Sequence, residues 1–89
     1  MTKFEKLGNE LREHAKDLIL EYMKSNPKCH PKQAGMKQAS LFRDSGLDCG
    51  DQKNAESTKQ QYWVVALLRT LETEGKIERV SPSGPWRLR

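Results

Sequence analysis

Long apolar runs are missing from this sequence, and cysteine is scarce. No apolar run approaches the roughly 18 residues that a bilayer-spanning helix needs, so no membrane span is expected. The N-terminus carries acidic residues from Glu5 onward and no continuous apolar stretch, which argues against a signal peptide. Two cysteines, Cys29 and Cys49, are too few for a disulfide framework. We therefore expect a cytoplasmic protein with two reduced thiols, with one disulfide bridge as the alternative.

Sequence motifs of catalysis and cofactor binding are missing as well. There is no glycine-rich phosphate loop, no G-x-S-x-G and no H-E-x-x-H. Cys29, His30 and Cys49 lack the C-x-x-C pair of a zinc site, and the aspartates between positions 44 and 51 lack the alternating ligands of a calcium loop. The 89 residues suffice for one small domain with a modest core. We expect no enzyme, no metal or other cofactor, and no small-molecule substrate.

A long first helix is predicted over about residues 3–25. Thr2 and Glu5 match a capping box, and Asn26-Pro27 ends the helix because the residue before a proline avoids helical geometry. Lys16 falls on a mixed, solvated face. An apolar stripe at three- and four-residue steps is formed by Phe4, Leu7, Leu11, Ala15, Leu18, Ile19, Tyr22 and Met23. The first two turns either extend past the core and contact a second copy, or pack against the C-terminal strand.

The middle of the chain contains a connector, a short helix and an acidic segment. Residues 28–35 form the connector, which we expect to hold a short strand or an extended segment. A second helix is predicted over about 36–44, ended by Ser45-Gly46, with Leu47 anchored beneath it. Residues 44–56 carry four acids and one base. This segment is longer than the 3–4-residue turn of a tight helix-turn-helix.

The last 33 residues are the most informative stretch. Ser57 and Gln60 match a second capping box, and a third helix is predicted over about 58–74. Its apolar stripe contains Val64, Leu67, Leu68 and Leu71, flanked by Trp63. Gly75 can take the left-handed conformation that ends a helix. Residues 76–89 then predict two short strands around the turn Ser-Pro-Ser-Gly-Pro.

The segment L-L-R-x-L-x-x-E-G-K-I-E-R-V (67–80), with G-P-W-R-L (84–88), resembles winged helix-turn-helix DNA-binding domains. It is most similar to modules at the N-termini of Mrr-type restriction proteins and of some transcription regulators. The similarity covers about 60 residues, from the early thirties to the end. It implies one mainly α domain (1–89) with a small β-hairpin, an α+β fold of three helices and a C-terminal wing at 76–89. It also implies a role in transcription regulation or restriction-modification.

The net charge of +4 is unevenly divided along the chain. Residues 1–26 are balanced, residues 27–43 carry four bases and no acid, and residues 57–89 carry six bases and three acids. A winged helix brings the two basic segments together on one face, which is the charge pattern expected of a phosphate binder. An ordinary solvated surface with a small positive excess is the plainer alternative.

The main hypothesis is that the chain binds double-stranded DNA, with the third helix in the major groove and with the second helix and the wing on phosphates. The outward face of the third helix and the basic segments supply the candidate contacts. These are Lys32, Lys37, Gln38, Ser57, Thr58, Lys59, Gln61, Tyr62, Arg69, Ser83 and Arg87. The alternative is a winged helix used for protein contacts, including a homodimer through the first helix.

Overall fold

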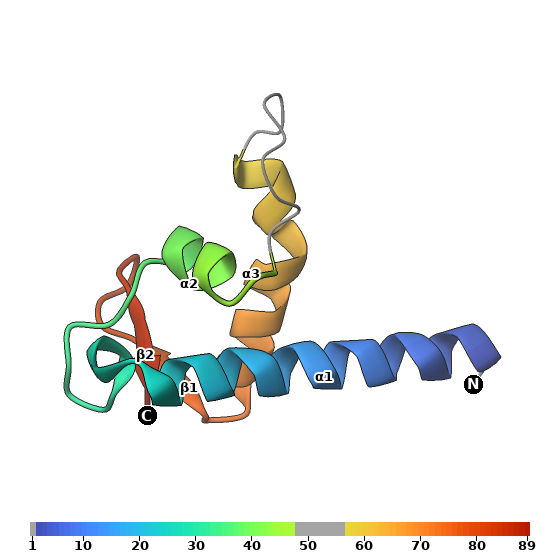
Figure 1. Cartoon of the computed structure of the whole chain (residues 1–89), viewed down its shortest axis with the longest axis horizontal. Helices are drawn as coiled ribbons and strands as arrows, with labels where there is room; N and C mark the ends of the chain where they lie inside the picture. Colours follow the sequence, from blue (N-terminus) through green and yellow to red (C-terminus); the bar gives the residue numbers. More distant parts are fainter. Residues whose placement is uncertain (1, 48–56) are drawn as a thin grey trace.

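The computed structural model describes the backbone of residues 2–47 and 57–89, and the side chains of residues 2–47 and 63–89. Within these residues the elements are α1 (Lys3–Ser25), a 3-10 turn η1 (Pro27–Cys29), α2 (Gln38–Asp44), α3 (Ser57–Thr73), β1 (Ile77–Arg79) and β2 (Trp86–Leu88). The two strands are antiparallel neighbours. In Figure 1, α1 lies across the base and α3 stands on it, with α2 and the hairpin to one side. The mainly helical α+β class predicted from the sequence is confirmed.

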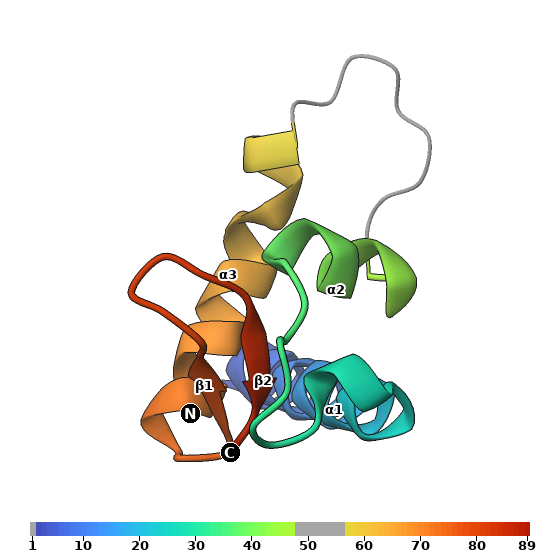
Figure 2. The ribbon, with the colours of Figure 1, turned by 90° about the vertical axis from the view of Figure 1, so that its left-hand side faces the viewer.

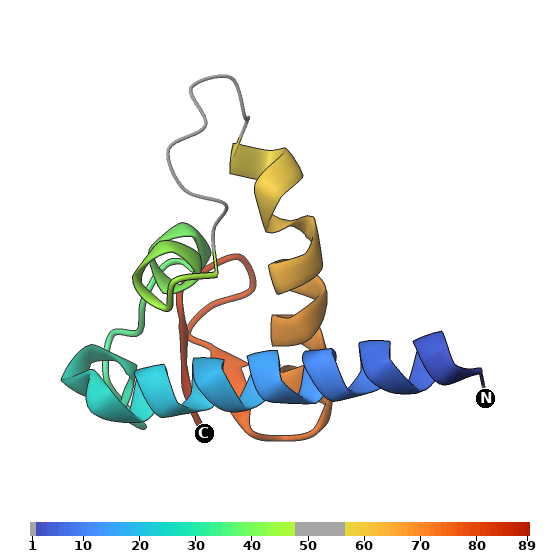
Figure 3. The same ribbon diagram turned by 45° about the vertical axis from the view of Figure 1, so that its right-hand side comes forward.

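Helix α1 spans the predicted range, but less of it is buried than its apolar stripe suggested. The Thr2 hydroxyl accepts a hydrogen bond from the Glu5 N–H at 3.1 Å, as the capping box predicts. The buried apolar residues of α1 are Ala15, Ile19 and Met23, all in its C-terminal half. The stripe residues Phe4, Leu7, Leu11 and Leu18 are exposed. The reason is visible in Figures 1 and 3: α3 and the hairpin cover only one half of α1, and the N-terminal half projects beyond them.

Lys16 was predicted on the solvated face of α1, and this prediction is wrong. Lys16 is only 5% exposed. The ammonium lies 2.9 Å from a carboxylate oxygen of Glu74, just past the end of α3, and 3.0 Å from Glu13 on the preceding turn of α1. These bonds raise the pKa of Lys16 and lower the pKa of Glu74. A buried cation is acceptable here because both partners are acidic.

The start of the second helix was also predicted wrongly. Helix α2 begins at Gln38, and Met36 instead pairs with Trp86 as an isolated antiparallel bridge, with N···O distances of 2.9 and 2.8 Å. The connector therefore does end in an extended segment beside β2, which can be followed in Figure 2. The helix therefore starts two residues later than predicted, because the backbone N–H and C=O of Met36 bond to β2.

One apolar core joins α1, α2, α3 and the hairpin. The stripe of α3 lies inside it as predicted, and Trp86 and Ile77 enter it from the strands. The buried residues of the α3 stripe are Val64, Leu67, Leu68 and Leu71. Gly75 has a φ of +75°, and the Gly75 and Lys76 N–H groups bond to carbonyls of the last helical turn, so α3 ends as predicted. Leu47 packs against the core from beyond α2.

Polar contacts fix α2 to the end of α1. The Tyr22 hydroxyl donates to Asp44 at 3.3 Å and accepts from the Asn26 amide at 3.1 Å, next to the Met36 sulfur.

Cys29 is a buried free thiol, and burial raises its pKa; Cys49 lies outside the described residues. None of the helices within the described residues combines the length and apolarity that a bilayer crossing needs.

Candidate nucleic-acid interface

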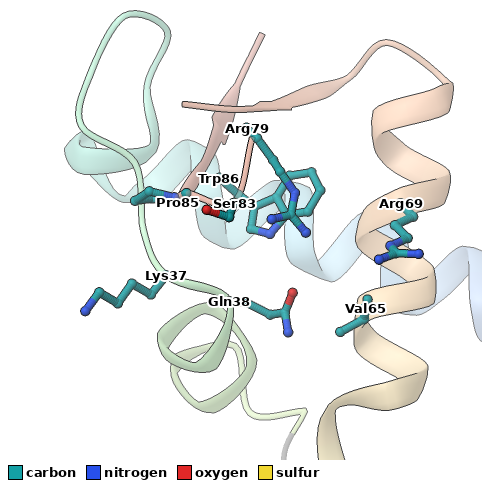
Figure 4. Close-up of a pocket in the computed structure, with 9 residues that line it drawn as sticks. Lys37, Gln38, Val65, Arg69, Arg79, Ser83, Pro85 and Trp86 are labelled. Atoms are coloured by element: carbon teal, nitrogen blue, oxygen red, sulfur yellow. The ribbon is translucent and has the colours of Figure 1, made fainter. Parts of the chain in front are cut away.

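A cleft of about 500 Å³ opens between the start of α2, the middle of α3 and the loop that joins β1 to β2. Figure 4 shows it with its lining side chains. Its lining combines an apolar floor with basic and polar side chains at the sides. The lining residues are Lys37, Gln38, Val65, Arg69, Arg79, Ser83, Gly84, Pro85 and Trp86. The cleft thus joins segments that are nearly 50 positions apart in the sequence.

Three cations from three different elements border this cleft. Lys37 precedes α2, Arg69 belongs to α3, and Arg79 ends β1. No carboxylate is among the lining residues, and no ion pair within residues 2–47 and 63–89 involves any of the three cations. None of the three positive charges is therefore held in an ion pair by the described side chains, and the acidic residue Glu72 lines a neighbouring hollow with Arg69 and Arg79. Like charges gathered at one concave site attract an anion.

Arg79 is fixed by the tryptophan beneath it. Its guanidinium carbon lies 4.4 Å from the centre of the Trp86 ring, a cation–π contact, and the two residues are register partners across the hairpin. Trp86 is 1% exposed, so this aromatic support is itself rigid within the core. Figure 4 shows the guanidinium of Arg79 lying over the indole and reaching into the cleft. Arg79 was not among the predicted contacts.

Arg69 faces the cleft from the opposite wall. It is exposed, and it lies one turn beyond the half-buried Val65 on the face of α3 that points away from the core. Figure 4 shows its guanidinium directed toward Gln38, whose side chain also points inward. The predicted position of Arg69, opposite the apolar stripe, agrees with this placement. Lys37 differs, because its ammonium points outward from the rim.

The hairpin loop contributes a polar wall. Ser83 lines the cleft next to Gly84 and Pro85. The Gly84 N–H bonds to the Ser81 carbonyl at 3.0 Å and the Val80 N–H to the Pro85 carbonyl at 2.8 Å, so the loop is closed on itself. Of the predicted contacts, the cleft therefore brings together Lys37, Gln38, Arg69 and Ser83.

Two predicted contacts lie away from the cleft. Arg87 pairs with Glu78, whose Oε2 lies 2.7 Å from both Nε and a terminal nitrogen of the guanidinium, and Arg87 also donates to the Gln33 carbonyl at 3.0 Å. Side chains alternate along a strand, so Arg87 is on the opposite face of β2 from Trp86. Lys32, with a φ of +68°, lies in the connector loop and is not among the lining residues.

The predicted base contacts lie in the first turns of α3. Ser57, Thr58, Lys59, Gln61 and Tyr62 belong to this helix, but their side chains lie outside the described residues. The same holds for the capping box at Ser57. Trp63, the first described side chain of α3, is half exposed and packs edge-on against Phe42, with ring centres 6.4 Å apart.

No family model, curated protein or solved structure matches this chain.

Proposed function

We propose that this chain is a winged-helix module that binds double-stranded DNA. Helix α3 enters the major groove, and α2 and the hairpin contact phosphates. The observation that carries the proposal is the meeting of Arg69 and Arg79 at one cleft, with Lys37 at its rim and without a carboxylate in its described lining. The phosphate groups carry the negative charge of a nucleic acid, and arginine recognises a phosphate with a planar fork of N–H donors.

The order of elements supports a winged helix. A first helix, an extended segment, two more helices and a hairpin follow one another along the chain. The extended segment pairs with the second hairpin strand through an isolated bridge between Met36 and Trp86, so it lies along the edge of the two-stranded sheet. In such a domain the last helix presents its outer face beside the wing, where the cleft lies.

The cleft and the first turns of α3 have different tasks in this proposal. Arg69 lies 12 residues after Ser57, or about 18 Å along the helix axis. The N-terminal half, with Thr58, Lys59, Gln61 and Tyr62, reaches base edges. Arg69 and Arg79 hold the phosphate backbone at the groove edge, which positions the helix without reading sequence. The biological role that fits is a transcription regulator, or the targeting module of a larger restriction-modification protein.

The test is a titration of short mixed-sequence duplexes with the chain at several salt concentrations. Arg69→Gln and Arg79→Gln should each weaken binding about tenfold at low salt, as loss of a charged hydrogen bond to phosphate does. Each should also make the slope of log affinity against log salt shallower by about 0.9, since one fewer counterion is released.

Lys24→Gln is the matched control. Lys24 is an exposed residue in the last turn of α1, and its loss changes the net charge by the same amount. It should leave affinity and salt slope near those of the parent chain. Equal losses for Lys24→Gln and Arg69→Gln would mean that only net charge matters. Absence of duplex binding at low salt would refute the proposed function.

A further inference from the structure

We propose that the exposed apolar stripe of α1 joins two copies of this chain in an antiparallel helix pair. The stripe consists of Phe4, Leu7, Leu11 and Leu18, of which Phe4 is 79% and Leu11 is 70% exposed. Steps of three, four and seven residues place these side chains on one line, the spacing of a helix that packs against another helix. His14 lies in the same line. This inference is independent of DNA binding.

The N-terminal arm of α1, residues 3–14, contributes no residue to the described core. The first buried residue of α1 is Ala15, and within the arm only Gly8 and Asn9 are partly buried while the other residues are exposed. Figures 1 and 3 show it projecting beyond α3. Helices of about 12 residues are marginal in water without packing, and Gly8 weakens this one further. The cap at Thr2 and the Arg12–Asn9 hydrogen bond are exposed local interactions that add little.

The charges of the helix favour a second copy as the covering partner. Between positions 3 and 14 the helix carries three bases and three acids, so two copies do not repel each other. An oppositely charged protein or nucleic acid would find no net charge to attract it. The partner's apolar stripe, by contrast, is chemically identical and self-complementary about a two-fold axis.

The flank of the stripe selects the antiparallel direction. Lys3 lies at one end of this flank, with Glu10, Asp17 and Glu21 following toward the other end at helical spacing. Antiparallel packing brings this flank against itself, so Lys3 meets Asp17 and Glu21 of the second copy and the symmetry repeats this pairing. The same register places the two Glu10 side chains opposite each other at the two-fold axis, one like-charge contact between two opposite-charge pairs. Parallel packing brings it against the opposite flank, where Gly8 and the other positions at this spacing are uncharged. In this arrangement the N-terminal arm of each copy lies beside the folded body of the other copy. Figure 1 shows that this arm extends beyond α3.

Sedimentation equilibrium of the full chain, from micromolar to millimolar concentration, tests the pairing. The parent chain should be a concentration-dependent dimer. Leu11→Glu should raise the dimer dissociation constant by about 100-fold or more, because two carboxylates would be buried at the seam. Leu11→Met keeps an apolar side chain and should remain dimeric. Leu11 is outside the core, so thermal unfolding of a monomeric form should be unchanged by either substitution.

A charge exchange tests the direction. Lys3→Asp and Asp17→Lys should each weaken the dimer, and the double variant should dimerise more tightly than either single variant, as a paired interaction requires. A parent chain that stays monomeric throughout would overturn the proposal, and so would a Leu11→Glu variant that still dimerises. If the double variant is weaker than both single variants, the antiparallel arrangement is wrong.

Discussion

Gly35 stands at the closest approach between the connector and β2. Its φ is +80°, and a Cβ added there would lie 2.7 Å from the Trp86 carbonyl oxygen and 3.0 Å from a methyl carbon of Val80. That carbonyl oxygen also accepts the Met36 N–H of the bridge. A side chain at this position therefore forces the bridge apart in addition to straining the backbone.

We predict that Gly35→Ala lowers the free energy of unfolding by about 2–4 kcal/mol, combining left-handed backbone strain with an overlap that the bridge must open to relieve. Chemical denaturation monitored by circular dichroism measures this. Gly46→Ala is a matched control, since Gly46 has the same φ, +79°, with nothing within 4 Å of an added Cβ. Its cost should be about 1–2 kcal/mol, the strain alone. Equal costs at the two glycines would contradict the role given to the Trp86 contact.

At the scale of single residues, the sequence indicated that arginines of the hairpin form the site, but it did not indicate which of them faces the cleft. Arg79 and Arg87 are both arginines of the hairpin, and only Arg87 was predicted as a contact. Arg79 shares a strand face with Ile77, so alternation from that buried residue directs it toward Trp86. That signal was present in residues 76–80. The bond of Arg87 to Glu78 depends on the register of the two strands, which the loop sets only once the chain has folded.

At the scale of the element, α3 has two faces with different tasks. Val64, Leu67, Leu68 and Leu71 close the core, while Val65 and Arg69 border the cleft. The effect of a substitution on the buried face should therefore be separable from the effect of one on the exposed face.

Leu67→Ala should reduce the free energy of unfolding by about 2–5 kcal/mol, the usual cost of removing a buried leucine side chain. Leu67 is 4% exposed and belongs to the core cluster. The nearby Thr70→Ala lies on the exposed side of the same helix and should change stability by no more than about 0.5 kcal/mol. Urea titrations of both variants provide the comparison. A loss at Thr70 as large as that at Leu67 would show that the faces are wrongly assigned.

Helix limits were predictable where local chemistry sets them. Thr2 at the start of α1 and Gly75 after α3 act through their own backbone neighbours, and both fall where predicted. The start of α2 was missed because Met36 bonds to a strand 50 residues later in the chain. The exposed stripe of α1 has the same origin: its spacing predicts an apolar face, but only the packing of α3 decides which residues of that face are covered.

At the scale of the whole molecule, the Lys16–Glu74 pair connects the first helix to the end of the third. The two residues are 58 positions apart in the sequence. The bond to Lys16 is the largest cause that lowers the pKa of Glu74. A depressed carboxyl pKa adds stability above the unfolded-state pKa, and this contribution is lost as the pH falls through the folded-state value.

We therefore expect the thermal midpoint to fall as the pH drops below the ordinary glutamate pKa of about 4.3. Glu74→Gln should have a lower midpoint at neutral pH and a smaller acid-induced decrease, because it has no carboxylate to protonate. Differential scanning calorimetry at a series of pH values from neutral into acid measures this decrease. Equal decreases in the parent chain and the variant would exclude Glu74 as a contributor.

The candidate site could be predicted only in part, since it exists only in the assembled molecule. Charge counting placed excess basic residues in two segments, and Lys37, Gln38, Arg69 and Ser83 do meet at one cleft. Spacing alone could not show that the basic connector residue Lys32 lies elsewhere. Nor could it show that an aromatic ring of the core supports a cation at the cleft floor.

That support has a consequence for how the cleft would capture a ligand. The contact with the Trp86 ring already restricts the side-chain rotamers of Arg79 in the folded protein. Little further conformational entropy would therefore be lost when Arg79 binds an anion. Arg69 is exposed and has to be immobilised at the moment of capture. The two arginines carry the same charge but differ in the entropic cost of binding an anion. Arg79, the preorganised one, would contribute more affinity for each hydrogen bond it forms.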